Sequence, residues 1–147
     1  MKSDWQYSRI IPVALVMGMI FFLSHQEGSS LPLPSIPYID KLAHFFIYSL
    51  LAGAALFAFP ASMRLRYPER TVVAVMIFCL IYGITDELHQ AFIPERDASI
   101  WDLFADFLGC AATVLFWYRQ QWLKPSPYYY ETKLSGAIKP DNASGVL

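Results

Sequence analysis

The chain has 147 residues, of which 56% are hydrophobic and 16% are charged. This is the size of one domain, but a water-soluble domain carries about 25% charged residues. The net charge of -1 leaves no basic face to neutralise phosphates and argues against a nucleic-acid partner. Cys79 and Cys110 both lie in apolar runs, which favours two buried apolar side chains over a disulfide or a redox pair.

Four apolar segments predict four membrane-spanning helices. A spanning helix needs roughly 20 residues, so the polar residues beside the shorter runs are included. We expect helices near 7–24, 41–59, 71–91 and 100–118. The fold class is therefore an all-α integral membrane four-helix bundle, with its membrane domain over 10–118. No small-residue cleavage site follows the first segment, which we interpret as a retained helix and not a signal peptide.

The distribution of charge predicts how this bundle is oriented. With four spans, residues 1–9, the loop 60–70 and the tail 119–147 share one side. That side holds nine of the eleven cations, and only Lys41 and Arg96 lie on the other. The positive-inside rule makes the basic side cytoplasmic, and with it the N- and C-termini. Most acidic residues and all three histidines then gather at the extracytoplasmic end.

The loop 25–39 contains Pro32, Pro34 and Pro37, which favour extended backbone, and it is long enough to cap the outer mouth of the bundle. In the next helix, Asp40, His44 and Tyr48 follow at intervals of four and share one face. Asp40 alone could be explained as the N-cap of that helix.

The third helix ends in a run of polar residues. Asp86 and Gln90 are four residues apart and Glu87 and Gln90 are three apart, so one face carries most of the group. Ionisable groups at this depth cost a few kcal/mol each unless they pair or reach water. The alternative is that the helix leaves the membrane earlier and these residues are solvated.

The fourth helix opens with Ser99 and Asp102 in the spacing of a capping box. Capping does not explain Asp106, one turn further on. Ala105, Gly109 and Thr113 continue that face as a stripe of small residues that suits close helix packing.

These polar residues predict one membrane-embedded cluster at the outer end. Its candidate site residues are Asp40, His44, Asp86, Glu87, Gln90, Arg96, Asp102 and Asp106. Five carboxylates face two cations, Lys41 and Arg96, and we expect Arg96 to pair with a carboxylate. The carboxylates cannot all stay ionised in a low dielectric, so some are protonated, share a proton or bind a cation.

Four interpretations of this cluster remain open. A carboxylate and His44 could act as a general acid–base pair. The set could bind a divalent metal that activates water or polarises a phosphate oxygen. It could be the proton or cation site of a small carrier, or a buried polar network that fixes the register of the helices.

Three motifs resemble the VanZ-like family over residues 24–116: DKLAHFFIY at 40–48, DELHQAFIPER at 86–96, and S-x-x-D-x-x-x-D-x-x-G at 99–109. The chain has Glu95 where the family often has glycine, and Asp106 where many members have asparagine. The resemblance implies a small multi-pass protein of the bacterial inner membrane. Its founding member is associated with low-level resistance to teicoplanin, a glycopeptide that binds cell-wall precursors outside the membrane.

From the resemblance we expect a protein that acts at the outer face of the membrane and influences teicoplanin susceptibility. The lipid bilayer is its expected environment, and cell-wall or envelope lipid precursors are its expected partners. A membrane-embedded enzyme acting on a lipid-linked envelope substrate is the alternative. The sequence assigns no particular metal, substrate or oligomeric state.

Overall fold

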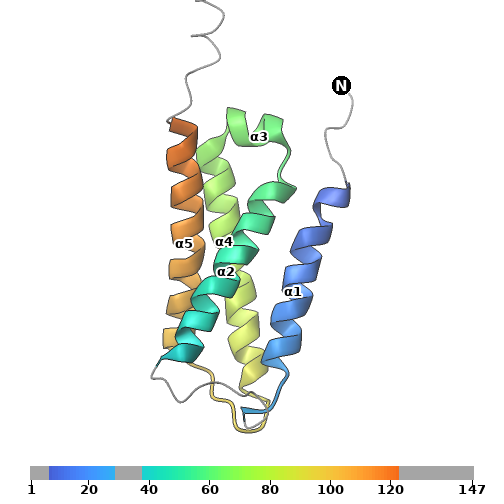
Figure 1. Ribbon diagram of the computed structural model, residues 1–147, viewed down its shortest axis with the longest axis vertical. Helices are drawn as coiled ribbons and strands as arrows, with labels where there is room; N and C mark the ends of the chain where they lie inside the picture. Colours follow the sequence, from blue (N-terminus) through green and yellow to red (C-terminus); the bar gives the residue numbers. More distant parts are fainter. Residues whose placement is uncertain (1–6, 29–37, 123–147) are drawn as a thin grey trace, which may run out of the picture.

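The computed structural model describes residues 7–28 and 38–122, and this part of the chain is helical without any strand. A short 3-10 helix, η1 (Tyr7–Arg9), leads into α1 (Ile11–Ser24). Then follow α2 (Ile39–Ala58), α3 (Ala61–Arg66), α4 (Pro68–Gln90) and α5 (Ile100–Trp122). The long helices α1, α2, α4 and α5 run along one another as a bundle (Figure 1).

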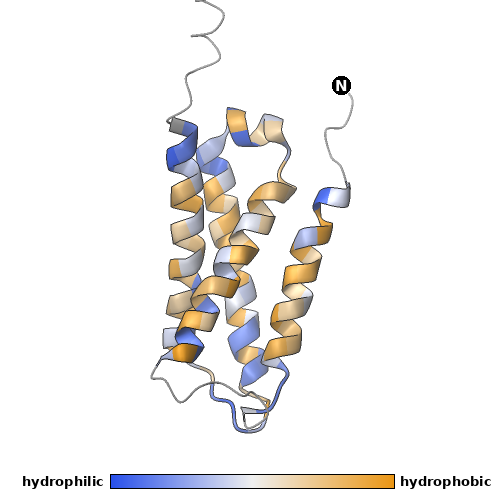
Figure 2. Ribbon diagram, in the orientation of Figure 1, coloured by the Kyte–Doolittle hydropathy of each residue, from blue (hydrophilic) through white to orange (hydrophobic). Residues whose placement is uncertain are grey.

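The predicted number of spans is confirmed. Four helical stretches are long and apolar enough to cross a membrane: Tyr7–Ser24, Ile39–Ala58, Pro68–Gln90 and Ile100–Gln121. Large apolar side chains such as Leu15, Phe46 and Phe116 are exposed on the outside of the bundle, as a lipid environment requires. Hydrophobic residues predominate along the middle of the helices, and hydrophilic residues are more frequent at both ends of the bundle (Figure 2).

Two predictions about the basic end need correction. The segment 60–70 was expected to be a loop, but Ala61–Arg66 forms α3, which lies across this end of the bundle, and α4 begins at Pro68 (Figure 1). The last helix also continues to Trp122, beyond the predicted end at 118. The predicted proline-rich cap lies largely outside the described residues, as do most of the two predicted tails.

The tightest packing joins α2 to α5, the pair with the most extensive contact. A Cβ atom on Gly109 would overlap the carbonyl of Phe45, so the two backbones approach closely at this point. Ser49 Oγ donates to the Gly109 carbonyl at 3.1 Å, and Thr113 Oγ1 donates to the Ser49 carbonyl at 3.2 Å. The predicted small-residue stripe on the last helix is therefore confirmed as a packing surface.

The apolar core lies among the four long helices and includes Ile20 of α1, Leu51 of α2, Val75 of α4 and Val114 of α5. Cys79 and Cys110 belong to it as free thiols, as predicted. α1 contributes fewer buried side chains, and the hydroxyl of Tyr82 joins it to α4 by donating to the Met17 carbonyl at 2.7 Å.

Candidate functional site

Polar side chains from α2, α4 and α5 are buried together at the end of the bundle opposite α3. The buried acidic and amide residues are Asp86, Glu87, Gln90, Asp102 and Asp106. The neighbouring helices therefore cover these polar turns of α4 and shield them from water. Asp86 and Gln90, which were predicted to share one face, are in contact: Gln90 Nε2 donates to Asp86 Oδ2 at 3.2 Å.

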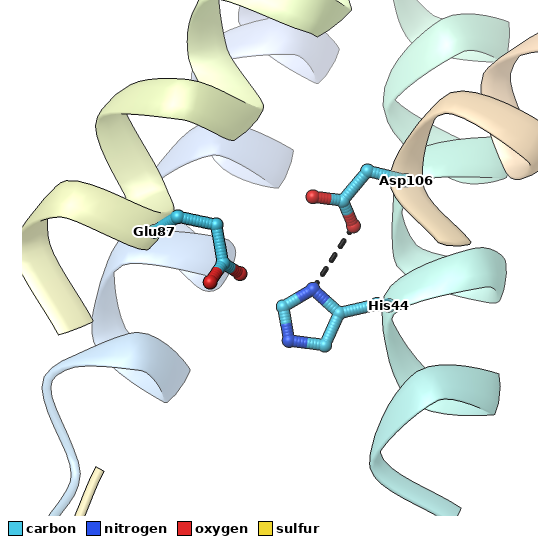
Figure 3. Close-up of side chains that lie close together, drawn as sticks. All are labelled: His44, Glu87 and Asp106. Atoms are coloured by element: carbon cyan, nitrogen blue, oxygen red, sulfur yellow. Dashed lines mark hydrogen bonds and ion pairs between the residues drawn. The ribbon is translucent and has the colours of Figure 1, made fainter. Parts of the chain in front are cut away.

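His44, Glu87 and Asp106 form the centre of the site, and we call them the central trio. His44 Nδ1 lies 2.9 Å from Asp106 Oδ1. Each of the three residues offers one ligand atom, and these atoms lie within 4.8 Å of one another. The Glu87 and Asp106 carboxylates face the imidazole of His44 from α4 and α5, while His44 itself comes from α2 (Figure 3).

Two carboxylate oxygens of the central trio have no partner within the described part of the chain. Glu87 Oε2 accepts a 2.7 Å hydrogen bond from the backbone N–H of Ser99, whereas its Oε1 is buried without one. Asp106 Oδ1 is bonded to His44, whereas its Oδ2 is buried without a partner. Buried polar atoms are normally satisfied, so these two oxygens need an explanation.

Gly83 on α4 makes room for one of these oxygens. A Cβ atom there would lie 3.1 Å from Asp106 Oδ2 and 3.0 Å from Leu103 Cδ1. Tyr48, which is fully buried, stacks on His44 with a 6.5 Å separation of ring centroids, and its hydroxyl has no partner in the described residues. The trio therefore lies against the ring of Tyr48 and beside Gly83.

Lys41 neutralises part of the acidic charge. Its Nζ atom lies 2.9 Å from Asp40 Oδ2 and 2.9 Å from Asp102 Oδ1, so it joins α2 to α5 beside the trio. Asp40 is the more exposed of the two carboxylates. The predicted role of Lys41 as a cation of this cluster is confirmed.

Among the residues that the structure describes, Arg96 does not make the predicted ion pair with a carboxylate. Its Nη2 atom donates to the carbonyl of Leu23 at 3.0 Å, which fastens the turn after α4 to the end of α1. It nevertheless lines a cavity of about 130 Å³ together with Asp40, His44 and Asp86. The apolar side of this cavity comes from α1 and α2 and includes Ile20, Leu23 and Ile47.

Two expected caps are also corrected. Asp40 lies in the first turn of α2, and the N-cap position is Tyr38 with a positive φ of 62°. Ser99 Oγ accepts from the backbone N–H of Trp101 at 3.2 Å, as a cap should, but Asp102 does not close the expected capping box. The backbone N–H of Ser99 donates to Glu87, and Asp102 accepts from Lys41. Both acidic residues therefore make contacts between different helices.

The structure adds residues that sequence reasoning missed. Ser24 accepts a 3.3 Å hydrogen bond from Gln90 Nε2 and so brings α1 into the polar network. The backbone N–H of Ser99 donates to Glu87, and the lack of a side chain at Gly83 leaves room for Asp106. Residue type alone does not indicate either role. His25 and His89 lie at the same end, with 3.3 Å between His25 Nδ1 and His89 Nε2, but they stack on Phe21 away from the central trio.

A histidine and two carboxylates from three helices are chemically suited to a divalent cation, since imidazole and carboxylate are both common ligands. The contact between His44 Nδ1 and Asp106 Oδ1 holds the imidazole ring in a fixed orientation. The same groups could also hold a shared proton.

Comparison with known proteins gives a family. The sequence model of the family described as VanZ/LLP1 matches residues 7–123. An uncharacterized protein of Schizosaccharomyces pombe is 27% identical over 103 residues, which cover 70% of this chain and 60% of that protein. The chain thus spans less than two thirds of the length of this relative. No solved structure matches the chain.

Proposed function

The chain belongs to the VanZ/LLP1 family, and we propose that it is a membrane-embedded, metal-assisted enzyme that acts on a lipid-linked substrate of the cell envelope. The observation that carries this proposal is the central trio: three ligand atoms lie within 4.8 Å of one another, and two buried carboxylate oxygens have no partner in the described residues. A divalent cation would satisfy both oxygens and balance the two negative charges.

The chemistry follows from the position of these ligands. A divalent cation held by His44, Glu87 and Asp106 would activate a water molecule or polarise a phosphate oxygen. The acidic residues around it would repel a phosphate group in the absence of a cation. Because the site attracts a phosphate group only when a cation is bound, we favour the metal-assisted reaction over acid–base chemistry with His44 alone.

The cavity beside the trio supports an amphiphilic substrate. Its polar side includes His44, Asp86 and Arg96, while its apolar side includes Ile20 and Ile47. A molecule with a polar head and a hydrocarbon chain matches these two sides, and the surrounding bilayer would supply it. We therefore assign the polar head of the substrate to the cavity.

We propose that the site faces outward and that the chain ends are cytoplasmic. The support is the excess of cations on the side of α3. Leu65 at that end and Phe92 near the site are both exposed, whereas the native cysteines are buried. In intact cells, a membrane-impermeant maleimide should label Phe92→Cys and leave Leu65→Cys unlabelled. Labelling in the reverse pattern would overturn the orientation.

The enzyme proposal is tested on lipids extracted from the envelope of a bacterial host. Purified protein is incubated with this extract in detergent, with Mn²⁺ or with a chelator, and each lipid species is followed by mass spectrometry. We expect a lipid-linked species to be consumed only with the metal, and expect Glu87→Gln to abolish its consumption. The matched control is Asp97→Asn, which removes an exposed carboxylate at the same end. Equal turnover by Glu87→Gln and the wild type would refute the assignment.

Susceptibility to teicoplanin is the cellular effect that the family resemblance leads us to propose. An enzyme that alters lipid-linked precursors at the outer face would change the targets that a glycopeptide meets. Expression of the wild type in a Gram-positive host should shift teicoplanin susceptibility, and Glu87→Gln at matched membrane levels should not. If Glu87→Gln gives the same shift as the wild type, the change in teicoplanin susceptibility does not depend on the central trio.

A structural role of the wider network is the second candidate. Lys41 joins two acidic residues across α2 and α5, and Gln90 joins α4 to Ser24 of α1. If the trio served only this role, Glu87→Gln would lower the yield of folded protein without altering lipid turnover per folded molecule.

A further inference from the structure

A separate polar pocket lies at the opposite end of the bundle, between α3 and the last turns of α5. It has a volume of about 200 Å³ and is lined by Ala61, Arg64, Leu65, Trp117 and Gln121. We propose that this pocket binds the phosphate of an anionic phospholipid headgroup. The proposal does not depend on the central trio or on any enzymatic activity.

Arg64 is the residue that points to an anion. Its Nε atom is buried and has no hydrogen-bond partner among the described residues. Burial, together with the positive charge of nearby Arg9, lowers the pKa of Arg64. An anion in the pocket would lie against Arg64, which lines it, and would offset the repulsion between the two arginines.

Three other arginines at this end have partners of their own. Arg66 and Arg70 lie over the ring of Tyr67, with 5.3 Å and 4.9 Å from guanidinium carbon to ring centroid. Arg9 donates to the Phe59 carbonyl at 3.5 Å and lies over Phe57. Arg64 lines the pocket and, within the described residues, is the arginine at this end with a buried side-chain donor that has no partner.

The charge at this end is strongly one-sided. Its described residues include five arginines: Arg9, Arg64, Arg66, Arg70 and Arg119. The acidic residue among them is Glu69, whose carboxylate accepts a hydrogen bond from the Tyr118 hydroxyl at 3.2 Å. Anionic lipids attract basic segments at a membrane surface by about 1 kcal/mol for each Lys or Arg.

The surroundings of Arg64 favour a lipid over a free phosphate ion. The pocket lies where the spanning helices end, which is the level of the headgroups. Leu65 is exposed beside it, and Trp117 belongs to a residue type that is enriched at membrane interfaces. A phosphate group would meet Arg64 while the attached acyl chains follow the apolar side chains.

The test measures thermal unfolding of the full chain in a neutral detergent as phosphatidylglycerol is added. We expect the unfolding temperature to rise with phosphatidylglycerol and not with phosphatidylcholine, since only the first carries a net negative charge. Arg64→Gln should weaken the apparent affinity at least about tenfold, the loss expected for a charge-assisted hydrogen bond. Arg66→Gln is the matched control, because it removes the same charge from the exposed side of α3 and should keep most of the response.

A second variant tests the pocket independently, in case Arg64→Gln does not fold. Gln121→Glu places a negative charge in the pocket and leaves Arg64 intact, and it should abolish the response to phosphatidylglycerol. Equal loss in Arg64→Gln and Arg66→Gln would mean diffuse attraction and overturn the proposal. Equal protection by sodium phosphate at the same phosphate concentration would overturn the assignment to a lipid, as would equal protection by phosphatidylcholine.

Discussion

His44 Nδ1 lies 2.9 Å from Asp106 Oδ1, and this contact joins α2 to α5 inside the part of the bundle that would lie in the membrane. The second oxygen of Asp106 remains buried without a partner in the described residues, on the side of Gly83. One carboxylate thus orients a histidine while keeping an acceptor for another group. The predictions below follow from this arrangement and its neighbours.

Asp106→Asn should weaken Mn²⁺ binding without lowering the stability of the fold. The amide oxygen can still accept from His44, so the fold should persist, and its free energy of unfolding should stay unchanged or rise by about 1 kcal/mol because a buried charge is removed. Affinity for Mn²⁺ should fall, because one anionic ligand is lost. Chemical denaturation and a metal titration of the same preparation check both parts. A lower stability with unchanged Mn²⁺ affinity would assign Asp106 to the scaffold.

Gly83→Ala should disturb the trio from α4. The new methyl group would stand 3.1 Å from Asp106 Oδ2 and 3.0 Å from Leu103 Cδ1, so side chains must shift. We expect a loss of about 1–3 kcal/mol in the free energy of unfolding, together with weaker Mn²⁺ binding. Gly18→Ala is the control, since nothing lies within 4 Å of the position that its Cβ would take. That variant should be neutral or slightly more stable. Equal behaviour of the two variants would show that Gly83 gives Asp106 no room that it needs.

Lys41→Met should destabilise the protein by leaving Asp102 buried beside an apolar side chain. Removing one partner of a fully buried pair costs about 3–5 kcal/mol, and the partial exposure of Lys41 reduces the expected loss to about 2 kcal/mol. Asp102→Asn in the same chain should restore most of this loss. A double-mutant cycle on the unfolding free energies measures the coupling. Additive losses would mean that the 2.9 Å contact contributes nothing to stability.

Glu95→Gly should stabilise the turn between α4 and α5. Glu95 has a φ of 60°, a left-handed conformation that costs a residue with a Cβ atom about 1 kcal/mol. Glycine adopts this conformation without that cost. We expect a higher unfolding temperature for Glu95→Gly and a lower one for the neighbouring Asp97→Gly, where no such conformation is relieved. A fall in both would show that the side chain of Glu95 outweighs the backbone strain.

The sequence was sufficient to predict the four spans and most of the polar residues that are buried together at one end of the bundle. Apolar runs locate the spans, and polar residues within those runs are rare enough to be informative: Asp86, Glu87 and Asp106 were recognised because they interrupt an apolar pattern. The stripe through Gly109 was predictable for the same reason, since small residues recur there at helical spacing.

The pairing inside the cluster was not predictable, because it depends on distances between helices. Arg96 was expected to meet a carboxylate but donates to the Leu23 carbonyl, a backbone group that no sequence pattern marks. Ser99 and Asp102 have the spacing of a local capping box, yet contacts with Glu87 and Lys41 prevail. α3 was missed because six residues with two arginines are too short to show an apolar periodicity.

The most direct measurement is the stoichiometry and affinity of Mn²⁺ binding to the purified, chelator-treated protein, with Zn²⁺ measured in parallel. The account predicts about one site per chain, at least about tenfold weaker binding in Glu87→Gln and in His44→Gln, and unchanged binding in Asp97→Asn. Circular dichroism of each variant confirms that the compared chains are folded. If the wild type binds neither ion, or if Asp97→Asn weakens binding as much as Glu87→Gln does, the central trio is not a metal site and the proposed function is wrong.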